Sequence, residues 1–221
     1  IDLDLVCGGP PCQGYSGIGH RRTYGVEKKE LPSNRLYEPM AKLIEDLHPK
    51  IFLFENVRGI LSGRWTENGN RGEIWESVLS RFQSIQGYSV KVSLVQAKDY
   101  GVPQNRPRVL LVGIRDDIAE AAGLDSSSEN LDAVQCGFLP PAKSGESPHI
   151  EDLLSDLVDP KVSGVLREQS YPKFFGSKVY RADPLNEIQH WLRTCPDGTL
   201  IKKGEPLTDH EFSRHSRAVV E

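Results

Sequence analysis

Short apolar runs alternate with amphipathic helical patterns along the first half of the chain, and this alternation limits the fold more than any other feature. The runs that fit strands are residues 3–7, 51–54, 89–96 and 109–114. The spacings that fit helices lie between them, ending near residue 47 and covering about residues 74–85. Strands and helices in alternation predict an α/β sheet layer.

Each predicted helix has one apolar face. On the first, the residues expected to face the core are Leu36, Met40, Leu43, Ile44 and Leu47. On the second, they are Ile74, Val78, Leu79, Phe82 and Ile85. Pro39 fits only within the first turn of its helix, because proline breaks a helix interior. We also expect residues 3–7 to form a buried strand holding Cys7, and the tryptophans Trp65, Trp75 and Trp191 to be packing residues.

Composition indicates a globular chain without a membrane span. Its 221 residues are enough for one substantial domain, or a domain with an appendage. No apolar run approaches the length of a membrane span, and the opening residues lack the pattern of a signal peptide. The four cysteines form no CxxC pair, and the six histidines show no metal-ligand spacing. A net charge of −4 means that any contact with nucleic acid needs a local group of basic residues, or basic residues supplied by sequence outside this chain.

Several chemically useful side chains follow or precede the predicted strands, where ligands bind in open α/β sheets. Cys12 follows two prolines, and a thiol on such a rigid turn is placed to act as a nucleophile, although an arbitrary cysteine is more often structural. Glu55 ends an apolar strand, where partial desolvation would favour its protonated form; a solvated carboxylate is the common alternative. Arg106 and Arg108 would share one side of an extended segment, or be ordinary surface charges.

Three motifs in this order resemble those of cytosine-C5 DNA methyltransferases. Residues 9–16 (GPPCQGYS) resemble the nucleophile motif, residues 55–57 (ENV) the glutamate motif, and residues 100–109 (YGVPQNRPRV) the arginine motif. The resemblance is strong over residues 3–115 and looser at residues 150–157. It implies a Rossmann-like, S-adenosylmethionine-dependent methyltransferase sheet and methyl transfer to C5 of a flipped-out cytosine in double-stranded DNA.

The resemblance also implies roles for individual residues. Cys12 would attack C6 of cytosine, Glu55 would serve N3 and the exocyclic amine, and Arg108 would hold the O2 edge, with Arg106 supporting the nucleophile. The residues expected to bind substrate are Gln13, Ser16, Asn56 and Gln104. Pro11 and Leu36 are the expected contacts to S-adenosyl-L-methionine. The polar stretch 13–34 is similar to the family's lid over the active site.

The predicted organisation has three segments, and the fold is expected to be incomplete. Residues 1–115 would form the catalytic core, 116–162 an acidic surface excursion with a short helix near 150–157, and 163–221 a segment leading toward target recognition. The N-terminal cofactor strands and the target-recognition region of the family are not visible in the sequence. We therefore expect an excerpt of a longer enzyme or one half of a split enzyme, completed by further segments or a second chain. The expected location is intracellular, in a bacterial cytoplasm or nucleoid or a eukaryotic nucleus.

Three other functions compete with this interpretation. A related branch of the family methylates cytosine in transfer RNA, although residues 14–16 favour the DNA branch. A non-catalytic regulatory relative would be expected to lose Cys12 or Glu55, and both are present. A cysteine hydrolase would need a histidine beside Cys12, and the sequence identifies none.

Overall fold

The computed structural model describes residues 2–11, 35–66, 68–127, 129–143, 147–158 and 177–208. The chain divides into two compact units, Ile1–Ser147 and Pro148–Glu221. We call them unit 1 and unit 2. The functional division into segments 1–115, 116–162 and 163–221 stays a prediction.

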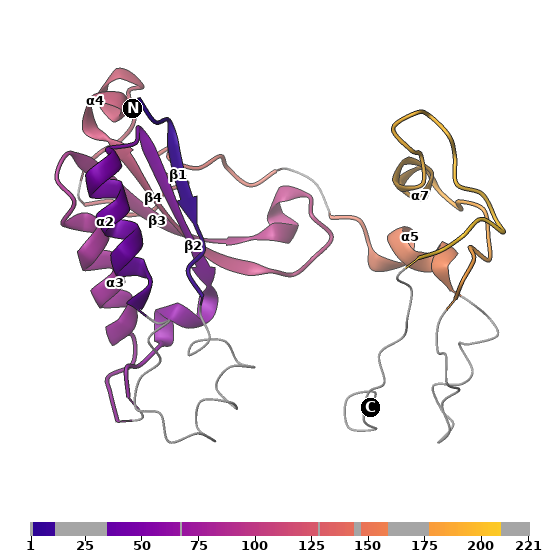
Figure 1. Ribbon diagram of the computed structural model, residues 1–221, viewed down its shortest axis with the longest axis horizontal. Coiled ribbons are helices and arrows are strands. Elements are labelled where there is room, and N and C mark those ends of the chain that lie inside the picture. Colours follow the sequence, from indigo (N-terminus) through magenta and orange to yellow (C-terminus); the bar gives the residue numbers. More distant parts are fainter. Residues whose placement is uncertain are drawn as a thin grey trace. The chain divides into compact units, whose positions relative to one another are not determined.

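Unit 1 is built on a four-stranded mixed sheet (Figure 1). The strands are β1 (Leu5–Gly8), β2 (Ile51–Val57), β3 (Tyr88–Gln96) and β4 (Pro107–Arg115), in the order β1-β2-β4-β3. β1 is parallel to β2, whereas β4 is antiparallel to both of its neighbours. All four correspond to predicted strands, so the predicted α/β class is confirmed.

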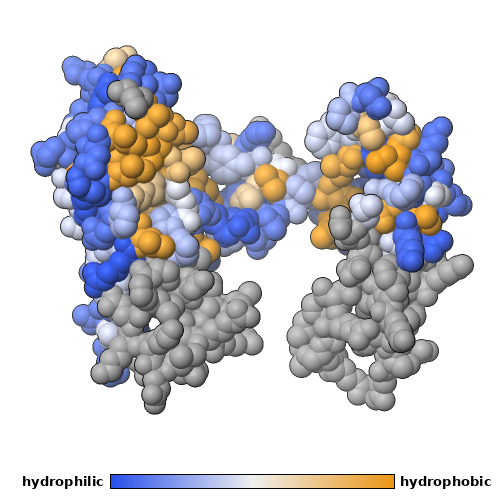
Figure 2. Space-filling model, in the orientation of Figure 1, coloured by the Kyte–Doolittle hydropathy of each residue, from blue (hydrophilic) through white to orange (hydrophobic). Residues whose placement is uncertain are grey.

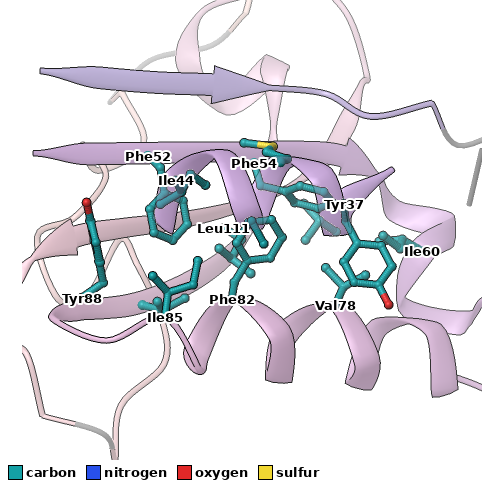
Figure 3. Close-up of a cluster of buried hydrophobic side chains, with 14 of the residues drawn as sticks. Tyr37, Ile44, Phe52, Phe54, Ile60, Val78, Phe82, Ile85, Tyr88 and Leu111 are labelled. Atoms are coloured by element: carbon teal, nitrogen blue, oxygen red, sulfur yellow. The ribbon is translucent and has the colours of Figure 1, made fainter. Parts of the chain in front are cut away.

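Helices α2 (Tyr37–Leu47) and α3 (Glu73–Gln83) cover one face of this sheet (Figure 1). Phenylalanines from both layers meet in the core, with the Phe82 ring centroid 5.5 Å from that of Phe52 and 5.2 Å from that of Phe54 (Figure 3). Pro39 lies in the first turn of α2, as the sequence requires. The two helices are also joined by Arg81 of α3, whose guanidinium contacts the carboxylates of Glu38 and Glu45 on α2.

The predicted apolar face of α2 is only partly correct. Met40 and Ile44 are buried, but Leu43 is 47 % exposed and Leu36 is 41 % exposed. The buried stripe is centred on the residues that point at the sheet, including Tyr37 and Ala41. A helix that packs on one flat layer buries a narrower stripe than the apolar spacing suggested.

The second face of the sheet is covered by the segment that follows β4. This segment begins with α4 (Asp116–Ala121). Its residues join Val112 and Ile114 of β4 in a second buried cluster, to which it contributes Ala119, Ala133, Cys136 and Phe138. Much of the segment predicted as an acidic surface excursion is therefore a layer of the fold. One of its acidic residues stabilises the backbone of the segment: the Asp132 carboxylate accepts hydrogen bonds from the N–H groups of Val134 and Gln135.

The prediction of a buried first strand is wrong. β1 lies at the sheet edge, with Leu5 51 % exposed and Cys7 also exposed. These two side chains point to the face opposite α2 and α3, and Figure 2 shows hydrophobic surface over β1. The expectation of a structural Cys7 rested on burial, which an edge strand does not guarantee.

Unit 2 contains the short helices α5 (Ile150–Leu154), η4 (Ser155–Leu157) and α7 (Glu187–Leu192), so the helix predicted near residues 150–157 is confirmed. Its centre is Arg193, 3 % exposed, whose Nη1 lies 3.0 Å from Oδ2 of the buried Asp156. The same guanidinium stacks on Tyr180 at 4.0 Å from the ring centroid. Trp191 is 74 % exposed, so its prediction as a packing residue is wrong, whereas Trp65 and Trp75 pack against the core of unit 1.

Three further features concern the described residues only. Within them, no helix combines the length and apolar character needed to cross a membrane. They hold no group of three or more His, Cys, Asp or Glu side chains that could ligate a metal ion. Cys7, Cys136 and Cys195 are free thiols.

The centre of the sheet leaves no room for a side chain at Gly113, and this gives a stability prediction. A Cβ at Gly113 would lie 2.0 Å from Cε1 of Phe52. We expect Gly113→Ala to lower the free energy of unfolding by about 1–3 kcal/mol, as overpacked cores do. In urea denaturation, the double variant Gly113→Ala/Phe52→Leu should lose less than the sum of the two single losses, because the smaller side chain relieves the clash. Additive losses would show that the Phe52 ring is not the obstacle.

Candidate active site

The carboxyl ends of β1 and β2 meet at one edge of unit 1 because the two strands are parallel. Gly8 of β1 pairs with Phe54 of β2, so the chain leaving β1 runs beside the next residue of β2, Glu55. The approach is close: a Cβ on Gly9 would lie 2.9 Å from Oε2 of Glu55 and 3.6 Å from its carbonyl oxygen. Glycine at position 9 therefore gives the Glu55 carboxylate its space.

Asn56 fastens the turn after β1 to the end of β2. Its side chain is 4 % exposed, and its Nδ2 donates a hydrogen bond of 3.2 Å to the carbonyl oxygen of Pro10. Its Oδ1 accepts a hydrogen bond of 2.9 Å from the N–H of Val57. With both ends of the amide engaged by backbone, this geometry favours a positioning role for Asn56 over the predicted substrate contact.

Glu55 and Arg108 face each other across β2 and β4. The antiparallel register pairs Val57 with Arg108, and Arg108 Nε lies 2.6 Å from Oε1 of Glu55. The Nε–H group is buried and forms no hydrogen bond within the described part of the chain, so this is a contact between charges without hydrogen-bond alignment. The Glu55 side chain keeps 41 % of its exposure. The Glu55 carboxyl group is therefore partly shielded from solvent, as the sequence predicts for the end of a strand.

Arg106 and Gln104 lie in the loop between the 3-10 helix η3 (Ala97–Tyr100) and β4, and both are exposed. The N–H of Arg106 donates to the carbonyl oxygen of Gln104 at 2.9 Å, a turn that precedes the strand. The sequence predicted one extended segment carrying both Arg106 and Arg108. The strand begins only at Pro107, so it includes Arg108 and not Arg106. Among the described interactions, none brings Arg106 to Glu55.

Pro140, Lys143 and Ser147, which follow β4 in the sequence, form hydrogen bonds with η3 and the start of this loop. The Tyr100 hydroxyl donates to the carbonyl oxygen of Pro140 at 3.1 Å, and the N–H of Lys143 donates to that of Asp99 at 2.8 Å. The Ser147 hydroxyl donates to the carbonyl oxygen of Val102 at 2.9 Å. The loop that carries Gln104 and Arg106 is therefore held at three points.

The predicted residues Cys12, Gln13 and Ser16 lie outside the described residues. Pro11, immediately before Cys12, is exposed at the end of β1. Leu36, the other predicted cofactor contact, is exposed at the N-terminus of α2. The buried Cys136 is no rival nucleophile, because burial raises the pKa of its thiol.

Sequence reasoning assigned no role to Gly9 and a different one to Asn56. Gly9 allows a close approach of the backbone to Glu55, and the Asn56 side chain forms hydrogen bonds with backbone groups. A pattern of residue types in the sequence does not reveal such contacts. The one available signal was their place in motifs that end neighbouring strands. Together, the described residues form an α/β site in which a carboxylate and a guanidinium meet beside the turn that leads to a cysteine.

Comparison with known proteins identifies the family. The model of the C-5 cytosine-specific DNA methylase family matches residues 1–175, and the chain belongs to this family. The type II methyltransferase M.DdeI of Desulfomicrobium norvegicum is 30 % identical over 222 aligned positions, covering 100 % of this chain and 44 % of the relative. M.FnuDI of Fusobacterium nucleatum is 34 % identical over 161 residues, which cover 73 % of this chain and 40 % of the relative. The chain thus spans less than half the length of these relatives.

A solved structure described as a DNA modification methyltransferase encoded within an Escherichia coli prophage is 23 % identical, with a TM-score of 0.48. The alignment covers 85 % of this chain and 42 % of that one. A likeness at this score is too weak to bear on function. The family assignment therefore rests on the sequence match.

The close approach of Gly9 to Glu55 predicts a strong effect of one methyl group. Gly9→Ala should displace the Glu55 carboxylate and lower the methylation rate of the complete protein about 10²-fold, the scale of a 1 Å misplacement. Gly8→Ala is the matched control, because the Cβ there would meet the flexible Met40 side chain, with Sδ at 3.0 Å. It should cost much less. Equal rate losses in the two variants would contradict the role of Gly9.

The position of Asn56 predicts a kinetic signature. Asn56→Asp places an acceptor against the carbonyl oxygen of Pro10, so kcat should fall by more than in Asn56→Ala, while KM for DNA changes little. The reason is that Asn56 holds the protein backbone and not the substrate. Steady-state kinetics on DNA, with thermal unfolding as the stability control, would measure this. A raised KM at unchanged kcat would restore the substrate-contact prediction.

Proposed function

We propose that this chain carries the catalytic centre of an enzyme that transfers a methyl group to C5 of cytosine in duplex DNA. The observation that supports this most directly is the 2.6 Å contact between Glu55 and Arg108 beside the Gly9–Pro11 turn. A carboxylate and a guanidinium at this separation can grip two edges of one pyrimidine ring. The nucleophile would come from the turn itself, at Cys12.

The reaction needs a nucleophile because C5 of cytosine is weakly reactive. The Cys12 thiolate forms a bond to C6, and the electron pair of the C5–C6 double bond shifts toward C5. Glu55 in its carboxylic acid form donates its proton in a hydrogen bond to N3 and accepts one from the exocyclic amine, which stabilises this charge, while Arg108 donates to O2. After C5 has gained the methyl group, a base removes the C5 proton. The resulting electron pair restores the double bond and expels the Cys12 thiolate.

The cofactor proposed by family membership is S-adenosyl-L-methionine, which supplies the methyl group when bound. The described residues fit such a group in part: Pro11 and Leu36 are apolar and exposed at the end of unit 1 where β1 ends. They would offer packing contacts. Further segments or a second chain would complete the pocket and recognise the DNA sequence.

The substrate base must leave the duplex, because C6 is not accessible to a thiol within the base stack. Glu55 and Arg108 would replace the hydrogen bonds that the extruded cytosine loses with its partner guanine. Ser16 and Gln13 are proposed to contact the DNA beside it, with Gln104 and Arg106 on the opposite loop. Such an enzyme acts where DNA is, in a bacterial cytoplasm and nucleoid or a eukaryotic nucleus.

Trapping by a mechanism-based substrate tests the proposal. DNA containing 5-fluorocytosine should form a covalent adduct with the complete protein in the presence of methyl donor, because fluorine blocks the loss of a proton from C5. Cys12→Ser should form no adduct and should lower methylation of ordinary DNA by at least about 10³-fold. Cys7→Ser is the matched control, removing an exposed thiol from the preceding strand without effect.

The same assay separates the alternatives. Methylation that persists in Cys12→Ser would favour a regulatory relative or a different nucleophile. Adduct formation on fluorocytosine transfer RNA, and not on duplex DNA, would transfer the activity to the RNA branch. A hydrolase would give no adduct with either substrate.

A further inference from the structure

Exposed basic side chains collect at the end of unit 1 that holds Glu55 and Arg108. The 3-10 helix η2 (Arg58–Ser62) follows β2 directly, and α2 and α3 begin at this end (Figure 1). The hairpin between β3 and β4 also starts here, because β4 is antiparallel to β2. The exposed basic residues of these loops are Arg58, Arg64, Arg71, Lys98 and Arg106.

The opposite end of unit 1 is acidic. There β1 and β2 begin, and β4 ends at the start of α4. Its exposed acidic residues are Asp2, Asp4, Asp46, Asp116, Asp117 and Glu120. Two basic residues at that end are paired with these aspartates, Lys50 with Asp4 at 2.7 Å and Arg115 with Asp117 at 2.7 Å. The site end also has the exposed acidic residues Glu76 and Asp99, fewer than its five exposed basic residues. The net charge of −4 therefore conceals an uneven distribution of charge over unit 1.

Hydrogen bonds hold the described part of the segment between Arg58 and Arg71 in place. The Glu73 carboxylate accepts hydrogen bonds from the N–H groups of Trp65, at 2.5 Å, and Asn70, at 3.0 Å. The N–H of Gly72 donates to the carbonyl oxygen of Gly63 at 3.2 Å, which returns the chain to the end of η2. Arg71 is thus fixed near the far end of the 3-10 helix that Arg58 begins.

A second contact holds the middle of this loop. The Arg35 guanidinium lies 4.8 Å from the ring centroid of Trp65, and the Trp65 ring packs against the core. Gly69 lies so close to Glu73 that a Cβ would be 2.0 Å from Oε1. A loop ordered in advance presents its arginines at a low entropic cost of binding.

We propose that Arg58 and Arg71 bind backbone phosphates of duplex DNA that flank the reacting cytosine. This rests on the proposed function, since it adds a surface to the same site. The five residues of η2 rise by roughly 10 Å, so the two guanidinium groups meet different phosphates of a polymer with one charge per about 1.7 Å of axis. Arginine suits this partner because its planar fork matches phosphate oxygens. The contact would be independent of base sequence.

The salt dependence of binding tests this surface. In the complete protein, the double variant Arg58→Gln/Arg71→Gln should reduce the slope of log K against log salt by about 1.8, since each neutralised phosphate contributes about 0.9. Affinity for specific and nonspecific duplexes should fall by the same factor. The matched control is Lys50→Gln/Arg115→Gln, which removes two positive charges at the acidic end and should leave the slope unchanged.

Each other outcome has a distinct meaning. An unchanged slope in Arg58→Gln/Arg71→Gln, with wild-type protein still trapped on fluorocytosine DNA, would overturn this surface and leave the proposed function standing. Equal slope losses in both double variants would show that overall charge, not this loop, is responsible. If Arg58→Gln/Arg71→Gln lowered the affinity for an RNA competitor and left the affinity for duplex DNA unchanged, the surface would bind RNA and the proposal for DNA would be overturned.

Discussion

The antiparallel register that sets Val57 of β2 opposite Arg108 of β4 is the constraint on which the site depends. A shift of one residue would turn Arg108 to the other face of the sheet, away from Glu55. Packing on both faces prevents that shift. Phe52 and Phe54 are buried under the helices, while Val112 is buried beneath the segment after β4. The hydrophobic core thus specifies the distance between two polar groups at its edge.

The Gly9–Pro11 turn, which precedes Cys12, is held by contacts of a different kind. Parallel pairing brings the end of β1 to β2, and the Asn56 amide then fixes the carbonyl oxygen of Pro10. Gly9 allows the backbone to pass beside the Glu55 carboxylate. Two residues of the glutamate motif therefore have different roles: Glu55 is the proposed substrate contact, and Asn56 holds the protein backbone. Their adjacency follows from strand alternation, which sends neighbouring side chains to opposite faces.

The four strands and the helices α2 and α3 of unit 1 were predictable because their apolar spacing fits one type of secondary structure, whereas the short helix α4 was not predicted. The failures share another cause: exposure depends on neighbours that a local pattern does not name. Cys7 and Trp191 looked like packing residues, but one lies on an edge strand and the other on an open helix face. The segment after β4 showed the reverse error, because its acidic composition hid the apolar residues that cover the sheet. The convergence of Glu55 and Arg108 was predictable from strand ends, whereas their roles and that of Cys12 remain predictions.

The buried ammonium group of Lys91 has a consequence for the order of assembly. The side chain is 1 % exposed, and its Nζ donates to the carbonyl oxygens of Ser127 and, at 2.6 Å, Asn130. A cation cannot lose its hydration before these acceptors arrive. The strand and the covering segment must therefore lose water together, in one cooperative event. A nascent chain that has formed β3 but not yet emerged to residue 130 would keep this face of the sheet hydrated.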